Sequence, residues 1–133
     1  MWVWFKSRAI FRPETSPSRP YSFGESDGPP MARRLEEFSR RLASNLLEAE
    51  LRAACARERL GLSDSLFANL TWVFPDRSLG PELDRVLNAG YLRGADLWHI
   101  ACALYVTRTP RDIWFLTLDE RQRLVAAELG FRA

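Results

Sequence analysis

The sequence predicts a single α/β domain built on a parallel sheet. After residue 30, short apolar runs of strand composition alternate with longer runs of helical spacing, and strands that alternate with helices favour a parallel sheet. A length of 133 residues suits one domain. A hydrophobic content of 47% is that of a folded protein.

The elements begin after an irregular segment. Most of the prolines lie before residue 31, so this stretch is predicted to lack regular structure. A helix is then predicted over 31–42, because Met31, Leu35, Phe38 and Leu42 have helical spacing. In the break that follows, Ser44 or Asn45 is a suitable N-cap for the next helix.

The rest of the chain is punctuated by glycine and proline, which end helices and strands. The expected elements are a helix over 46–60 closed by Gly61, a turn or short helix over 62–70, a strand over 72–74 stopped by Pro75, a helix over 81–88 closed by Gly90, a buried helix over 95–106, a strand over 113–118, and a helix over 119–129 closed by Gly130.

Composition narrows the function classes. The net charge is only +2, which disfavours a purely basic RNA-binding module. Lys6 is the only lysine among 19 basic residues; the arginine excess suits phosphate binding but also follows from GC-rich coding. One histidine and two cysteines exclude a zinc site built from those residues. Cys55 and Cys102 are expected to be buried thiols in a cytoplasmic protein, and no apolar run reaches the ~20 residues of a membrane span.

Glu50 lies on the apolar face of the helix expected over 46–60. Glu48 and Arg52 share the opposite face at the i,i+4 spacing of a surface ion pair. A carboxylate on a core-facing side is costly unless it is paired, hydrogen-bonded or bound to a cation. Glu50 is therefore a candidate site residue, and the alternative is an ion pair with Arg57.

Asp96 and His99 interrupt the apolar surface of the helix expected over 95–106. Asp96 lies in the first turn, where an acid can cap the helix or complement its dipole. A histidine in such a helix is more often a satisfied core residue than a ligand. At three residues from Asp96, His99 is also spaced to orient that carboxylate.

Asp119 follows the strand expected over 113–118 and begins the last helix. With Gln122 three residues later it forms a capping box. In a parallel sheet, however, ligands bind at the carboxyl ends of the strands, where Asp119 and Asp96 can meet. Converging acids repel unless divalent cations screen them, and oxygen ligands select hard ions such as Mg²⁺ or Mn²⁺. Such a cluster supports phosphodiester hydrolysis by metal-activated water.

Three segments that carry these acids resemble the PIN domain of the VapC-type toxin family. They are SNLLEAELRAA (44–54), LRGADLWHIACAL (92–104) and FLTLDERQRLVAAELGF (115–131). In that family an acid lies six residues after a Ser or Thr, an Asp begins a D-x-x-H-x-A helix, and a T-x-D ends a late strand. Glu50, Asp96 and Asp119 occupy these positions.

The resemblance implies a three-layer α/β/α domain over residues 23–133, with a central parallel sheet, after an atypical segment at 1–22. It implies a ribonuclease that uses Mg²⁺ or Mn²⁺, with Glu50, Asp96 and Asp119 as metal ligands and catalytic residues. It also implies a homodimer silenced by a cognate antitoxin protein.

Further residues lie close to these acids in the sequence. His99 and Thr117 are candidates to support the acids. Arg93, Arg121 and Arg123 are candidates to steer phosphate, and the alternative is that they are ordinary surface arginines.

The chain departs from the family at its first strand, which in the family ends in a metal-binding Asp. Residues 1–20 contain no Asp. One explanation is that residues 1–22 reflect a frameshift, a misassigned start or a degenerate strand. The alternative is that Trp2–Phe5 forms the strand and that Glu25 or Asp27 reaches the metal from a loop. The missing Asp also favours a second function, a catalytically inactive PIN-like domain that serves in dimerisation or antitoxin binding.

Overall fold

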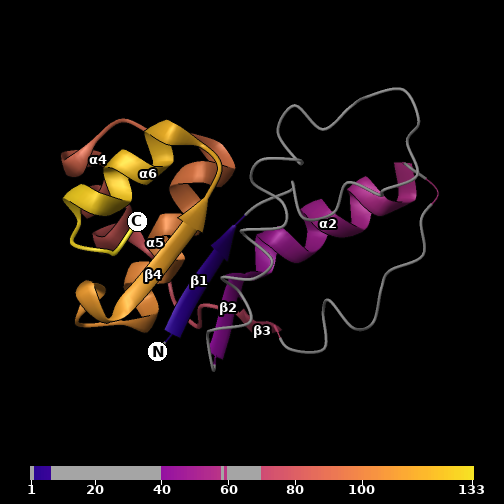
Figure 1. The fold of residues 1–133 in the computed structure, drawn as a ribbon, viewed down its shortest axis with the longest axis horizontal. Helices are drawn as coiled ribbons and strands as arrows, with labels where there is room; N and C mark the ends of the chain where they lie inside the picture. Colours follow the sequence, from indigo (N-terminus) through magenta and orange to yellow (C-terminus); the bar gives the residue numbers. More distant parts are fainter. Residues whose placement is uncertain (1, 7–39, 58, 60–69) are drawn as a thin grey trace.

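The computed structural model describes residues 2–6, 40–57, 59 and 70–133 (Figure 1). These residues form a mixed α/β structure with a small parallel sheet. Its strands are β1 (Trp2–Lys6), β2 (Arg40–Ser44), β3 (Leu70–Val73) and β4 (Ile113–Thr117). Its helices are α2 (Asn45–Arg57), α4 (Gly80–Ala89), α5 (Gly94–Val106) and α6 (Glu120–Glu128), with a 3₁₀ turn η2 (Pro110–Asp112) before β4.

The four strands lie in the order β3-β2-β1-β4, and every neighbouring pair is parallel. This confirms the parallel α/β class. The strand β1 lies inside the sheet, where Trp4 is in register with Leu42 on one side and with Phe115 on the other. The segment expected to be atypical therefore contributes an inner strand. Glu25 and Asp27, the proposed loop ligands, lie outside the described residues.

The strand β2 corrects the helix predicted over 31–42. Residues 40–42 belong to a strand, as do Ala43 and Ser44, whereas 31–39 lie outside the described residues. Arginine, leucine and alanine are good helix formers, so the local sequence favours a helix here. Pairing with β1 and β3 on both sides overrides that preference, and Leu42, Ala43 and Ser44 are buried in the sheet.

The remaining helices match the predicted positions closely. Pro81 lies in the first turn of α4, and Asp119 is the N-cap of α6. The helix α2 ends earlier than predicted: Arg57 is its last residue, and Arg59 has a φ of 55°, outside the helical region. The turn or short helix predicted over 62–70 lies outside the described residues except for Leu70, which begins β3.

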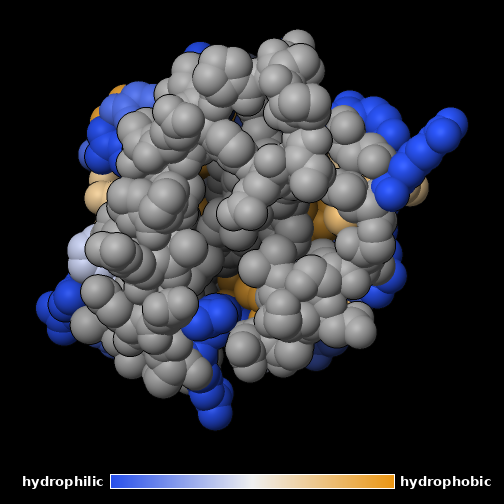
Figure 2. Space-filling view, turned by 45° about the vertical axis from the view of Figure 1, so that its right-hand side comes forward, coloured by the Kyte–Doolittle hydropathy of each residue, from blue (hydrophilic) through white to orange (hydrophobic). Residues whose placement is uncertain are grey.

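The hydrophobic core is centred on α5, which packs against α4 and β2. Its residues from His99 to Leu104 are all buried. Cys55 and Cys102 are buried thiols, as predicted. In the view of Figure 2, the described residues at the rim are mostly hydrophilic, and hydrophobic atoms show farther in. Within the described residues, no helix has the length and apolar character needed to cross a bilayer.

Candidate functional site

The carboxyl ends of the parallel strands lie at one edge of the sheet. The strand β2 leads directly into α2, and Leu118 alone separates β4 from Asp119, the N-cap of α6. Figure 1 shows α2 extending from this edge on one side of the strands, with α4, α5 and α6 grouped on the other. The three candidate acids belong to helices that begin near this edge. Glu50 lies in α2, Asp96 in the first turn of α5, and Asp119 is the N-cap of α6.

His99 forms hydrogen bonds with Glu50 on one side and with Ser44 on the other. The Nε2 atom of His99 lies 2.8 Å from Glu50 Oε1, and its Nδ1 atom lies 2.6 Å from Ser44 Oγ. His99 and Ser44 are fully buried, while 14% of the Glu50 side chain is exposed. Glu50 thus lies on the side of α2 that helical spacing assigned to the apolar face, and the structure shows His99 as a hydrogen-bond partner of its carboxylate. A serine hydroxyl so deeply buried is not placed to act as a nucleophile.

Ser44 is also the residue directly before α2, and its side chain caps the amino end of that helix. The backbone N–H of Leu47 donates to Ser44 Oγ at 3.3 Å, which is the N-cap contact predicted for Ser44 or Asn45. Asn45 has another role, since its Oδ1 accepts a hydrogen bond from Trp98 Nε1 at 3.2 Å. The start of α2 is therefore tied to α5 at two neighbouring positions.

Gln122 contacts both segments that carry the other two acids, Asp96 and Asp119. Its backbone N–H donates to Asp119 Oδ1 at 2.7 Å, which confirms the predicted cap. Its side chain does not close the capping box in the expected way: Oε1 accepts from Thr117 Oγ1 at 2.6 Å, and Nε2 donates to the Asp96 carbonyl at 3.1 Å. Asp119 N–H in turn donates to Thr117 Oγ1 at 3.1 Å. The buried amide of Gln122 thus links the end of β4 to the first turn of α5.

Sequence reasoning missed the roles of two buried polar residues, Ser44 and Gln122. Each had a local explanation as a helix cap, so neither stood out as a site residue. The available signal was a polar side chain next to a predicted buried strand end. Their partners His99 and Asp96 are 55 and 26 residues away.

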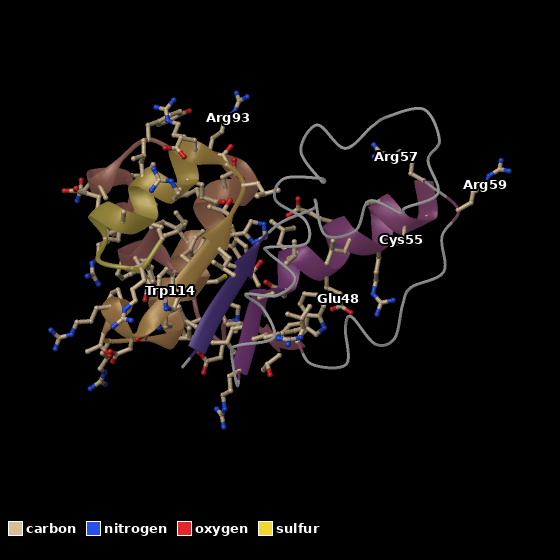
Figure 3. All side chains as sticks on the ribbon, in the orientation of Figure 1. Glu48, Cys55, Arg57, Arg59, Arg93 and Trp114 are labelled. Carbon is tan, nitrogen blue, oxygen red and sulfur yellow. The ribbon has the colours of Figure 1, made fainter. Side chains whose placement is uncertain are left out.

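The arginines that are close in sequence to the acids differ in their contacts. Arg121 stacks over the Tyr91 ring at 5.7 Å, and Arg123 pairs with Glu120 at 2.5 Å. The Arg123 guanidinium lowers the pKa of Glu120. Arg93 is exposed just before α5, and Figure 3 shows it well apart from the arginines at the far end of α2. The contacts of Arg121 and Arg123 are typical of surface arginines.

Other titratable groups form a second, exposed group around α4. Arg77 hydrogen-bonds the Glu82 carboxylate and thereby lowers the pKa of that acid. Tyr105 donates its hydroxyl to Asp76 Oδ1 at 2.6 Å, which raises the pKa of the tyrosine. These contacts fasten the loop after β3 to α4 and α5.

The described residues do not form a closed metal-binding cage. Among the described residues, no three His, Cys, Asp or Glu side chains are grouped closely enough to hold one. Mg²⁺ usually keeps several waters and is bound by one or two carboxylates plus a substrate phosphate. In donor chemistry the carboxylates Glu50, Asp96 and Asp119 suit an ion held in that open manner, but among the described residues they do not form a closed protein cage.

Comparisons with known proteins yield no relative. No protein-family model matches this chain, and no curated protein or solved structure matches it either.

Proposed function

We propose that this chain is a Mg²⁺- or Mn²⁺-dependent ribonuclease of the toxin–antitoxin type, in which Glu50, Asp96 and Asp119 serve the metal and the reaction. One observation carries the proposal. Three acids that are distant in sequence belong to segments joined by partly buried hydrogen bonds at the carboxyl edge of a parallel sheet. His99 makes the link for Glu50, and Gln122 makes it for the segments of the two aspartates.

In this proposal the acidic residues bind the metal, and neighbouring polar residues position them. Glu50, Asp96 and Asp119 offer carboxylate oxygens, the ligands that hard cations prefer. A bound divalent ion supplies activation of water and neutralisation of the charge that develops on the phosphate. Gln122 and His99 keep the acidic segments in place, and RNA enters from the exposed side of Asp119.

The fold proposed with this function is the three-layer α/β/α arrangement of the PIN domain. The parallel strand order β3-β2-β1-β4 and the helices that follow β2 and β4 support it. Dimer formation and an antitoxin partner belong to the same proposal, since they come from the resemblance to the VapC-type family.

The decisive experiment compares two Asp→Asn variants. Asp96→Asn should abolish Mn²⁺-dependent cleavage of single-stranded RNA while the circular dichroism spectrum and melting temperature stay close to those of the parent. Asp112→Asn is the matched control, because Asp112 is exposed and precedes the amino end of β4, at the opposite edge of the sheet. Equal cleavage by Asp96→Asn and the parent would contradict the assignment.

The second candidate is a catalytically inactive PIN-like module for dimerisation or antitoxin binding. Two observations favour it: β1 ends in Lys6 where the family has an Asp, and the described residues hold no group of three metal-binding side chains. Calorimetry with Mn²⁺ separates the candidates. Binding in the micromolar to low millimolar range supports the ribonuclease, and no heat of binding at millimolar metal supports the inactive module.

A further inference from the structure

His99 is enclosed where α5 meets β2 and α2. It is the only histidine of the chain, and none of its surface is exposed. Its ring nitrogens contact Ser44 at the end of β2 and Glu50 in the second turn of α2. A buried ring bonded through both nitrogens has one orientation, because turning it would leave polar atoms without partners.

The contacts with Glu50 and Ser44 favour a proton on His99 Nε2. An ionised Glu50 carboxylate only accepts hydrogen bonds, so His99 Nε2 must donate. Ser44 Oγ already accepts from Leu47 N–H at 3.3 Å, and its own hydroxyl proton can be donated to His99 Nδ1. The neutral ring with its proton on Nε2 therefore satisfies all of these atoms.

We infer that His99 is a positioning residue that fixes the Glu50 carboxylate at the edge of the sheet, and that Ser44 fixes His99. The Glu50 side chain lies at the boundary of the interior, with one oxygen held by the buried ring and part of its surface reaching solvent. Insofar as Glu50 serves a metal, this inference rests on the proposed function. Hydrogen bonds to ligating residues typically govern about 10- to 100-fold in metal affinity.

The first test reads the histidine ring directly and needs neither metal nor activity. Because His99 is the sole histidine, the imidazole ¹⁵N resonances of the ¹⁵N-labelled full chain report it alone. We expect a protonated Nε2 and an unprotonated Nδ1, and we expect Glu50→Ala to shift the Nε2 resonance. A ring protonated only on Nδ1, or ring resonances unchanged in folded Glu50→Ala, would overturn the inference.

The second test compares two amide replacements of His99. In His99→Gln the side-chain N–H falls near the position of Nε2 and can still donate to Glu50, whereas the shorter Asn amide cannot reach it. We expect the Mn²⁺ affinity of His99→Gln to stay within about threefold of that of the parent. The affinity of His99→Asn should fall by about tenfold or more. Both affinities are measured by calorimetry on variants whose melting temperatures agree.

The outcomes separate the two ideas. Equal Mn²⁺ affinity in folded His99→Asn and the parent overturns the positioning role. A parent that binds no Mn²⁺ refutes the proposed metal-dependent function, and the tautomer and Glu50→Ala measurements then still decide whether His99 holds Glu50.

Discussion

Gln122 donates a hydrogen bond from its side-chain Nε2 to the backbone carbonyl of Asp96, at 3.1 Å and across 26 residues of sequence. The same amide accepts the Thr117 hydroxyl, and the residue is fully buried. One side chain therefore holds the end of β4 and the first turn of α5 together. Each of these segments carries one of the candidate acids, Asp119 and Asp96.

Removing the Gln122 amide should destabilise the fold. Gln122→Leu keeps much of the volume but leaves the Asp96 carbonyl and the Thr117 hydroxyl without this partner. We expect the free energy of unfolding in urea to fall by about 1–3 kcal/mol. Glu128→Gln, an exposed change on the same helix, should stay within about 0.5 kcal/mol. Equal midpoints for the two variants would show that the link contributes little.

Gly90 should not tolerate a side chain. A Cβ atom built there would lie 2.7 Å from Val125 Cγ2, where the end of α4 meets α6. Gly90→Ala is therefore expected to cost about 1–3 kcal/mol of unfolding free energy through overpacking. The double variant Gly90→Ala/Val125→Ala should lose less than the sum of the two single variants, because truncating the valine makes room. Additive losses in thermal or urea unfolding would argue against the clash.

Cys102 should make stability depend on pH in the alkaline range. Burial raises the pKa of this thiol from 9.0 to about 12. Between these values the unfolded chain has released the proton and the folded chain retains it, so stability is intact below pH 9 and falls as the pH rises toward 12. The slope from this one group is at most about 1.4 kcal/mol per pH unit. Cys102→Ala should flatten the stability curve from pH 9 to 11 relative to the parent, and parallel curves would contradict the prediction.

Lys6 offers a test of the proposed metal site. It ends β1 in register with Thr117, the last residue of β4. Lys6→Asp replaces a positive charge by a carboxylate at a backbone position in register with Thr117, so under the proposed function we expect Mn²⁺ to bind at least about tenfold more tightly by calorimetry. Lys6→Asn is the control, since it removes the charge without adding a ligand. Lys6→Asp binding Mn²⁺ no more tightly than Lys6→Asn would contradict a metal site at this end of β1.

Local signals predicted most of the helices and one feature of the candidate site. Pro81 at the start of α4, the apolar run of α5 and the Asp119 cap of α6 act within one or two turns, so they can be read from neighbouring residues. The inward position of Glu50 follows in the same way from helical spacing. The hydrogen-bond partner of Glu50 cannot be predicted from helical spacing, because His99 is 49 residues away in the sequence.

The strand β2 shows where local reading fails. Its Arg-Arg-Leu-Ala-Ser sequence favours a helix, and it forms a strand because β1 and β3 offer backbone partners on both sides. The starts of α4, α5 and α6 and the inward-facing carboxylate are thus encoded in short stretches of sequence. The order of the strands, the burial of His99 between Ser44 and Glu50, and the bridge made by Gln122 arise only when distant segments pack, since each depends on contacts that no single stretch contains.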